Sequence, residues 1–456
     1  MYERTAIKQL LAWKDRTNRK PLILRGARQV GKTTLVKMFA KEFDHFINLN
    51  LEKVKERQIF EENDDLDAII AILFLQKGIV ADKQSKILIF IDEIQNSPKT
   101  VGLLRYFYEE KKELYVIAAG SLLESILGNH ISFPVGRVEY LVLRPFSFYE
   151  YLMAKKKEQT IELLAKIPFP DYAHRLMLDL FKEYVLIGGM PEIVSHYLEY
   201  QDLVLLSAIF DNLITTYIED VEKYARNENQ VRIIRHIINN AIKLAGERIR
   251  FEGFSQSNYK SRDVGECFRI LEKTFFLRLV YPSTVTKIPL VENLRKSPKL
   301  QILDTGMINH FAGVQVQILS NKQIDQVYEG KIAEHITGQE LLTLQTSPLA
   351  KNLFWVKEKK QSNAELDYLL QVDNWLIPIE VKLGKSGRLR SLMEFIDLAP
   401  HNFAVRVYSG KLSIEQTKTI KGNPFSLLNL PFYLISQIEQ YIRWMISQQS
   451  ISNTLA

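Results

Sequence analysis

The stretch "LILRGARQVGKTTL", residues 22–35, constrains the fold of this chain more than any other part of the sequence. Gly26 and Gly31 bracket four residues and Lys32-Thr33 follows, which is the spacing G-x-x-x-x-G-K-T. A loop of this kind wraps a phosphate chain with its backbone N–H groups, and the glycines permit the turn and the close approach. We expect Lys32 to reach the β- and γ-phosphates and the Thr33 hydroxyl to hold Mg²⁺.

The residues on either side of the loop favour the same interpretation. Residues 21–24 are typical of a short buried strand, and residues 35–43 are typical of an amphipathic helix. A helix that begins near Lys32 would direct its positive dipole end at the bound anion. Arg28 and Thr34 complete the predicted nucleotide contacts. The alternative is a glycine-rich turn that matches the spacing by chance.

Length and composition place the chain among ordinary proteins with several domains. It has 456 residues, of which 46% are hydrophobic and 25% charged, enough for two to four domains with their own cores. The lone Cys267 excludes an intramolecular disulfide and fits a reducing compartment. The first twenty residues are charged throughout, unlike a secretory signal, and the most apolar window, 68–75, is too short to span a bilayer. We expect a soluble, cytoplasmic protein without a membrane partner.

A second strand with an acidic end predicts the rest of the nucleotide site. In "KILIFIDEIQN", residues 87–91 form a continuous apolar run, as expected of a strand buried on both faces of a parallel sheet. The strand ends in Asp92 and Glu93, at the edge where ligands bind in open α/β sheets. Asp92 would coordinate Mg²⁺ through water, and Glu93 would polarise the water that attacks the γ-phosphate. A next strand, 114–121, ends in Ser121, which could sense the γ-phosphate.

This order of loop, acidic strand and polar-tipped strand resembles the AAA+ ATPase superfamily over roughly residues 1–200. The segments "GARQVGKTTL", "IFIDEIQ", "AAGS", "VGRVEYLVLRPFSFYEYL" and "LIGGMPEIV" resemble one prokaryotic branch of it. The resemblance implies ATP and Mg²⁺ as cofactors, ATP hydrolysis, and self-association through this domain. It also makes Arg137 of the "GR" element a candidate arginine finger, for a neighbour's nucleotide or its own. In the alternative interpretation, Arg137 pairs with a carboxylate such as Glu139 or Glu150.

Positive charge is concentrated in the middle of the chain. The net charge is +7, and residues 231–300 alone hold 14 Lys and Arg against 6 Asp and Glu. Such a segment indicates a polyanionic partner or a solvated basic face, and charge alone does not separate the two. Amphipathic helices, a polar stretch, a further helix and a β-hairpin suggest a winged helix-turn-helix, which would contact DNA or pack beside the ATPase. The residues that would face phosphate are Arg262, Arg269, Lys273 and Arg278.

Two strands near the C-terminus concentrate charged side chains on one face. In "AELDYLL", alternation puts Glu365 and Asp367 on the same face, and in "IPIEVKLG" it does the same for Glu380 and Lys382. If the strands pair through the turn at 373–374, Asp367, Glu380 and Lys382 converge. The two carboxylates would bind Mg²⁺ and a scissile phosphate, and the lysine would help to activate a water or stabilise charge.

A preceding acidic helix, "EGKIAEHITGQELL", places Glu334 as a possible third carboxylate. The pattern D-x12-E-x-K after such a helix resembles the PD-(D/E)xK restriction-endonuclease-like superfamily, although "LD" replaces the "PD" of the motif. Segments including "KSPKLQILDTGMIN" and "FWVKEKKQSNAELDYLL" resemble a domain of unknown function that follows this AAA branch. The alternatives are two amphipathic strands with solvated faces, or a nuclease-like fold without cleavage.

The sequence therefore predicts an α/β protein with four parts. These are an AAA+-like P-loop domain with a parallel sheet (1–200), a winged-helix middle domain (201–310), a small α/β nuclease-like domain (311–430) and a C-terminal helix (431–456). The predicted function is ATP hydrolysis that governs a metal-dependent nuclease acting on nucleic acid, with DNA favoured over RNA. The second hypothesis is an ATP-switched regulatory or adaptor protein that binds nucleic acid or protein without cutting.

Overall fold

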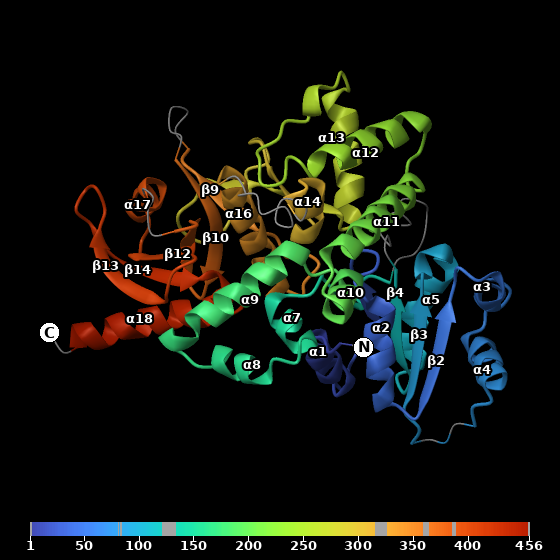
Figure 1. Ribbon diagram of the computed structural model, residues 1–456. Coiled ribbons are helices and arrows are strands. Elements are labelled where there is room, and N and C mark those ends of the chain that lie inside the picture. The colour runs from blue at the N-terminus through green and yellow to red at the C-terminus, as the bar shows by residue number, and fades with distance from the viewer. Residues whose placement is uncertain are drawn as a thin grey trace. The chain divides into compact units, whose positions relative to one another are not determined.

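The computed structural model describes residues 2–80, 82, 84–120, 134–314, 326–358, 364–384 and 389–454. The chain forms two compact units (Figure 1). The first comprises Met1–Arg144, Lys273–Phe275 and Thr346–Leu349, and the second contains the rest. The middle and C-terminal parts thus belong to one compact unit, and their finer division stays a prediction.

The first unit contains a five-stranded sheet in which every pairing is parallel, in the order β2-β3-β4-β1-β5. Its strands are β1 (Leu22–Arg25), β2 (His45–Asn50), β3 (Ile87–Asp92), β4 (Tyr115–Ala119) and β5 (Glu139–Val142). Its helices are α1 (Ala6–Lys14), α2 (Lys32–Phe39), η1 (Ala40–Glu42), α3 (Val54–Glu61), α4 (Leu66–Lys77), η2 (Ile94–Asn96) and α5 (Pro98–Glu110).

Alternating residues of β3 show why this sheet is covered on both faces. Ile87, Ile89 and Ile91 pack in one core cluster with residues of α3, α4 and α5. Leu88 and Phe90 point to the opposite face by the two-residue period of a strand, and they are fully buried too. The prediction of a doubly buried parallel strand is confirmed.

The second unit is built around a seven-stranded mixed sheet in the order β13-β14-β12-β11-β10-β9-β7. Its strands are β7 (Pro282–Ser283), β9 (Leu353–Val356), β10 (Glu365–Val372), β11 (Trp375–Val381), β12 (Phe403–Tyr408), β13 (Ser413–Lys418) and β14 (Pro424–Pro431). Strand β11 pairs antiparallel with β10 and parallel with β12. The helices that follow or precede these strands are α16 (Gln326–Thr343), α17 (Arg390–Ile396), η5 (Phe432–Gln437) and α18 (Ile438–Thr454).

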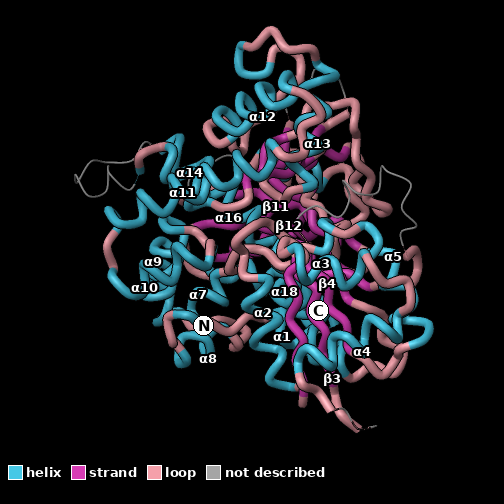
Figure 2. Tube along the Cα trace, turned by 90° about the vertical axis from the view of Figure 1, so that its right-hand side faces the viewer, coloured by secondary structure: helices cyan, strands magenta, loops and turns pink. Residues whose placement is uncertain are grey.

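The same unit also contains the helices that follow the five-stranded sheet in the chain, except that Lys273 at the end of α13 belongs to the first unit. They are α7 (Phe148–Ala154), α8 (Glu158–Leu164), η3 (Asp171–Ala173), α9 (His174–Ile187), α10 (Pro191–Tyr200), α11 (Leu203–Glu222), α12 (Glu228–Ala241), η4 (Phe254–Gln256), α13 (Ser261–Lys273) and α14 (Thr305–Phe311). The four isoleucines 233, 234, 237 and 238 are fully buried, which confirms the predicted amphipathic helix α12. Helices α12 and α13 lie side by side in both views (Figures 1 and 2).

The strand after α13 belongs to an antiparallel pair, as a β-hairpin requires, but a long connection separates its two strands. Strand β6 (Leu277–Val280) pairs antiparallel with β8 (Lys299–Ile302), which lies far along the chain. Isolated bridges from Ala245 and Arg248 to β8 add a third short segment beside the pair. The helices and short strands follow the predicted order, and their assignment as a winged helix stays a prediction.

Candidate functional site

The loop between β1 and α2 has a backbone shape that requires its glycines. Gly26 has a φ of 146°, and a Cβ atom there would lie 2.2 Å from the carbonyl oxygen of Leu143. Gly31 caps α2 with a φ of 91°, in the left-handed region that side chains disfavour. The chain can therefore turn tightly from the strand into the helix.

The side chain of Lys32 reaches back into the loop that precedes this residue. Its Nζ donates to the carbonyl oxygens of Gly26 and Ala27, at 2.9 Å each, and the residue is 8% exposed. These carbonyls are neutral acceptors, which bind an ammonium less strongly than a phosphate oxygen does. Contact between this ammonium and the phosphates stays a prediction.

Thr33 and Asp92 are brought together from separate segments. The Thr33 hydroxyl donates to Asp92 Oδ2 at 2.6 Å. Asp92 ends β3 and is 8% exposed, and burial raises the pKa of its carboxyl above the usual range although the Thr33 hydrogen bond opposes this. In P-loop proteins, Mg²⁺ is held by a hydroxyl oxygen of the loop and by a carboxylate at the end of a strand. These two side chains therefore fit the metal that accompanies a bound nucleotide.

Glu93 follows Asp92 in an unusual backbone conformation. It has a φ of 52° and a ψ of 43°, which is rare for a residue with a side chain. The Gln95 amide donates to Glu93 Oε2, and a Cβ at Gly120 would lie 2.3 Å from Gln95 Oε1. Gln95 therefore fixes the candidate base against the end of β4. Sequence reasoning missed this glutamine, and its position two residues after the acidic pair was the available signal.

The remaining predicted nucleotide residues have different positions. Arg28 is half-buried in the loop and Thr34 is exposed in the first turn of α2. Ser121 lies outside the described residues. Arg137 precedes β5, at the amino edge of the parallel strands, whereas the loop leaves the carboxyl edge. This topology separates Arg137 from its own loop by the length of a strand, and the guanidinium pairs with Glu109 of α5 at 2.9 Å rather than with Glu139 or Glu150.

The hairpin of β10 and β11 brings the C-terminal charged residues together. Val372 pairs with Trp375 across the predicted two-residue turn, and Asp373 has a φ of 51°. Since Tyr368 pairs with Ile379, the next position sets Asp367 opposite Glu380. The Lys382 ammonium lies 2.6 Å from Glu380 Oε1, and the predicted convergence of these three residues on one face of the hairpin is confirmed.

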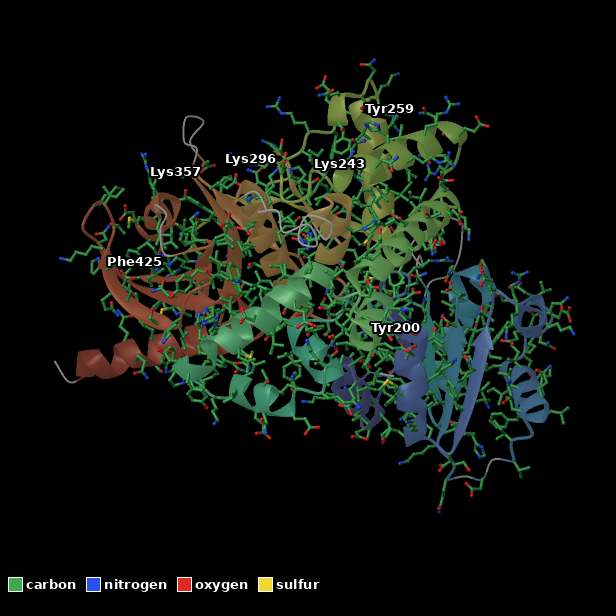
Figure 3. All side chains as sticks on the ribbon, viewed as in Figure 1. Tyr200, Lys243, Tyr259, Lys296, Lys357 and Phe425 are labelled. Carbon is green, nitrogen blue, oxygen red and sulfur yellow. The ribbon has the colours of Figure 1, made fainter. Side chains whose placement is uncertain are left out.

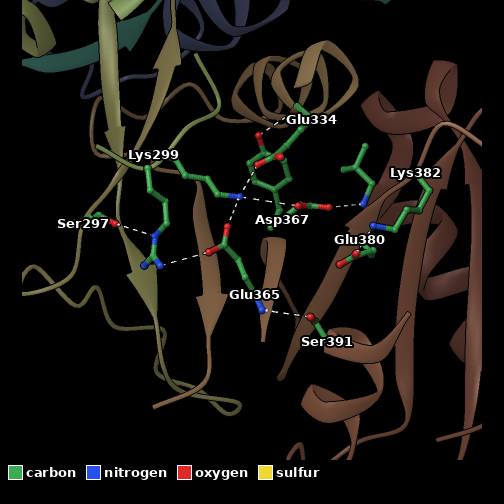
Figure 4. A network of polar contacts seen from close by, with 11 residues as sticks. Ser297, Lys299, Glu334, Glu365, Asp367, Glu380, Lys382 and Ser391 are labelled. Atoms are coloured by element: carbon green, nitrogen blue, oxygen red, sulfur yellow. Dashed lines mark hydrogen bonds and ion pairs between the residues drawn. The ribbon is translucent and has the colours of Figure 1, made fainter. Parts of the chain in front are cut away.

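The acidic face also contains a lysine that sequence reasoning missed (Figure 4). Lys299 of β8 places its Nζ 2.6 Å from Glu334, 2.8 Å from Glu365 and 4.0 Å from Asp367. Nothing in the local sequence marks this lysine, because β8 is distant along the chain. Glu334 was predicted as a metal ligand, and the structure places it against Lys299.

Burial controls the protonation of this cluster. Burial and then the charge of Asp367 raise the pKa of both Glu334 and Glu380 to about 7, and burial raises the pKa of Asp367. Glu380 Oε2 is buried with no hydrogen-bond partner among the described residues. Among the residues that the structure describes, no three His, Cys, Asp or Glu side chains lie close enough together to hold a metal ion. Coordination by Glu334, Asp367 and Glu380 together therefore stays a prediction.

Helix α13 carries a basic stripe. Arg262, Arg269 and Lys273 recur seven and four residues apart and are exposed, which places them on one face of the helix. The fourth candidate, Arg278, is half-buried and donates to the Ala350 carbonyl oxygen at 3.0 Å. Other basic residues of the segment, such as Lys243 and Lys296, lie on loops outside the helix (Figure 3).

Comparison with known families places the loop between β1 and α2 in a known domain. Residues 18–152 match the family described as "AAA domain". They form a P-loop ATPase domain. Residues 178–318 and 329–428 match two domains of unknown function, DUF8612 and DUF4143. These two matches assign no activity to the rest of the chain.

Individual relatives are distant. An uncharacterized protein of Haemophilus influenzae is 24% identical over 323 residues, 67% of this chain and 72% of that protein. A Walker-type ATPase of Pyrococcus abyssi is 16% identical with a TM-score of 0.43, over 68% of this chain and 96% of that one. A STAND signal-transduction ATPase of Pyrococcus horikoshii, with a tetratricopeptide repeat sensor, has 16% identity and a TM-score of 0.28, over 76% and 46%. The ATPase assignment rests on the family match and the loop geometry.

The structure also bears on membrane association. Among the helices that it describes, none combines the length and apolar character needed to cross a membrane.

Proposed function

We propose that the ATPase domain binds ATP with Mg²⁺ and hydrolyses it, with Glu93 as the base. The observation that carries this proposal is the contact between Thr33 and Asp92 beside the buried Lys32 ammonium. Lys32 would neutralise charge on the β- and γ-phosphates, and Thr33 and Asp92 would hold the metal. Glu93, fixed by Gln95, would orient and deprotonate the attacking water.

The second part of the proposal assigns the acidic face of the hairpin to phosphodiester cleavage in nucleic acid. It rests on the juxtaposition of Asp367, Glu380 and Lys382 and on the unpartnered Oε2 of Glu380 among the described residues. Mg²⁺ keeps several waters and takes one or two carboxylates plus substrate phosphate oxygens, so two carboxylates suffice. Lys382 would stabilise the charge that develops on the phosphate, and Glu334 would support the site from outside.

Nucleic acid is proposed as the substrate because of the exposed basic stripe on α13, of which Arg262 and Arg269 belong to the same compact unit as the hairpin. Arg262, Arg269 and Lys273 could neutralise backbone phosphates without reading bases. ATP turnover would govern access to the cleavage site. We favour DNA over RNA, since helices of this kind enter the major groove of B-form duplexes.

One observation favours the second candidate function, an ATP-switched adaptor that binds without cutting. Lys299 already neutralises Glu334 and Glu365, and a site so compensated has less attraction for metal ions. In that case the hairpin would be a binding surface in which Lys299 and Lys382 contact phosphate or a partner's carboxylates.

A cleavage assay tests the proposed function. Linear, circular and single-stranded DNA and RNA are incubated with Mg²⁺ or Mn²⁺, with and without ATP, using the Asp367→Asn variant as the control. The nuclease proposal expects cleavage by the wild-type protein only. If neither DNA nor RNA is cut under any of these conditions while ATP is hydrolysed, the adaptor function replaces it.

A further inference from the structure

The most informative residue of the acidic cluster is Lys299, which the hairpin motif does not contain. It reaches the cluster from β8, and its side chain is 8% exposed. Its Nζ also lies 4.9 Å from the centroid of the Phe354 ring, a cation–π contact that helps to fix it. Figure 4 shows the ammonium directed between Glu334, Glu365 and Asp367.

The charges of the cluster are not fully compensated by protein groups. Four carboxylates, those of Glu334, Glu365, Asp367 and Glu380, face three cations. The cations are Lys299, Lys382 and Arg248, whose guanidinium lies 3.5 Å from Glu365. A buried carboxylate in excess is stabilised either by a proton or by one more cation, so the cluster can exchange a proton for a cation.

The acceptor oxygens that remain for such a cation can be identified. Glu334 and Glu365 are satisfied by Lys299, whereas Glu380 contacts Lys382 through Oε1 only. Glu380 is 6% exposed and its Oε2 has no hydrogen-bond partner within the described ranges. Asp367 lies opposite on β10 and accepts the Val381 N–H with Oδ2 at 2.7 Å. The open acceptor is therefore Glu380 Oε2, and Asp367 can add Oδ1, which lies 4.0 Å from Lys299 Nζ.

We propose that Lys299 stands in the place of a second metal ion, so that the cluster binds a single divalent cation at Asp367 and Glu380. An ammonium within 2.6 and 2.8 Å of two carboxylate oxygens holds the acceptors that a second ion would need. This inference rests on the proposed function, and it deepens it by specifying a one-metal site. Glu334 and Glu365 then serve to position Lys299 and do not coordinate metal.

Calorimetric titration of Mn²⁺ into the nucleotide-free full chain tests the inference. The Asp92→Asn substitution removes the metal site of the ATPase domain from every sample. Lys299→Met removes the internal cation. The double variant Lys299→Met/Glu365→Gln removes the same cation together with one carboxylate, so the net charge of the cluster does not change. Lys299→Arg keeps the charge, and Lys331→Met removes a lysine from an exposed ion pair with Glu247 and is the matched control.

The inference expects one Mn²⁺ per chain in the parent, Lys299→Arg and Lys331→Met, none in Glu380→Gln, and two in both Lys299→Met variants. Two ions or none in the parent, or one ion in the Lys299→Met variants, would overturn it. If a Lys299→Met variant is unfolded in EDTA, refolding on addition of Mn²⁺ supports the inference and failure to refold contradicts it. Two ions in a parent that cleaves nucleic acid would overturn the role of Lys299 alone and leave the proposed function standing.

Discussion

Two carbonyl oxygens accept hydrogen bonds from the ammonium of Lys32, and the effect of removing this ammonium can be predicted. A phosphate chain would draw the ammonium into charge-assisted hydrogen bonds, each worth about 1.5–3 kcal/mol. Lys32→Ala should therefore weaken ATP binding by roughly 100-fold. Equilibrium binding of a fluorescent ATP analogue measures this, with Lys37→Ala on the same helix as the control. Equal affinities would show that the ammonium does not contact the nucleotide.

The role of Glu93 in hydrolysis can be tested apart from nucleotide binding, because Glu93 takes no part in the Thr33–Asp92 contact. Glu93→Gln keeps the size of the side chain but removes the base, so ATP binding should persist while turnover falls roughly 100- to 10,000-fold. Steady-state phosphate release gives kcat, and the binding assay gives the affinity. Turnover at the wild-type rate would exclude Glu93 as the base.

A buried carboxyl outside both sites predicts how stability depends on pH. Glu340 is 1% exposed, and its Oε1 accepts from the Tyr184 hydroxyl and the Phe148 N–H. Burial raises the pKa of Glu340 to about 7, so the folded state holds a proton that the unfolded state releases above about pH 4.3. Its contribution to stability is complete below that pH and is lost as the pH rises to 7.

Glu340→Gln keeps the acceptor oxygen and removes the titration. Between pH 5 and pH 8, the free energy of unfolding of the wild type should fall by about 3 kcal/mol relative to that of the variant. Urea unfolding of both proteins at the two pH values gives the difference, and contributions from other titrating groups cancel in it. Parallel pH profiles would contradict the raised pKa.

Helix α13 carries its basic residues on one exposed face, so the prediction for nucleic acid belongs to the element. If the stripe contacts phosphates, Arg262→Glu/Arg269→Glu should weaken binding to all sequences alike and reduce the salt slope of log K by about two. Lys55→Glu/Lys77→Glu on α3 and α4 makes the same change of net charge elsewhere. Binding that does not depend on salt, or equal effects of the two double variants, would leave α13 a packing helix.

Local patterns predicted those elements whose side chains face a single environment. The apolar run of β3 and the isoleucine face of α12 translate directly into burial, and the alternation in β10 does so in part. Strand β11 is buried on both faces, which its alternation did not predict. The hairpin turn was predictable too, because two residues between alternating strands leave few registers. These are short-range signals, and the loop glycines belong to the same class.

Contacts between distant segments were beyond the reach of sequence reasoning. Lys299 and Glu334 meet through the packing of β8 near α16, and no periodicity links a lysine to a carboxylate 35 residues later. The pairing of β6 with β8 was missed for the same reason, since a long connection carries no register signal. Gln95 is only two residues from Glu93, but its position also depends on its packing against Gly120 after β4. The candidate site was therefore predicted as residues, but not as the network that sets its charge.

At the scale of the whole molecule, the two candidate sites belong to different compact units. The Lys32 loop lies in the first unit, and Asp367, Glu380 and Lys382 lie in the second. Each sheet has its own buried core, so a substitution in the hairpin need not disturb the other sheet. This separation allows the two activities to be removed one at a time.

We expect Asp367→Ala and Lys382→Ala to remove cleavage while ATP hydrolysis stays within about twofold of the wild type, because the two sites belong to different compact units with separate cores. Removing Asp367 leaves Lys299 with less compensation, so thermal melting must first show that the second unit remains folded. Lys351→Ala, which breaks an exposed ion pair with Glu292, serves as the control in the same unit. Cleavage of labelled DNA and release of phosphate are measured on the same preparations. Loss of both activities in a folded Lys382→Ala protein would show that the hairpin participates in the nucleotide cycle, whereas retained cleavage would place the phosphodiesterase site elsewhere.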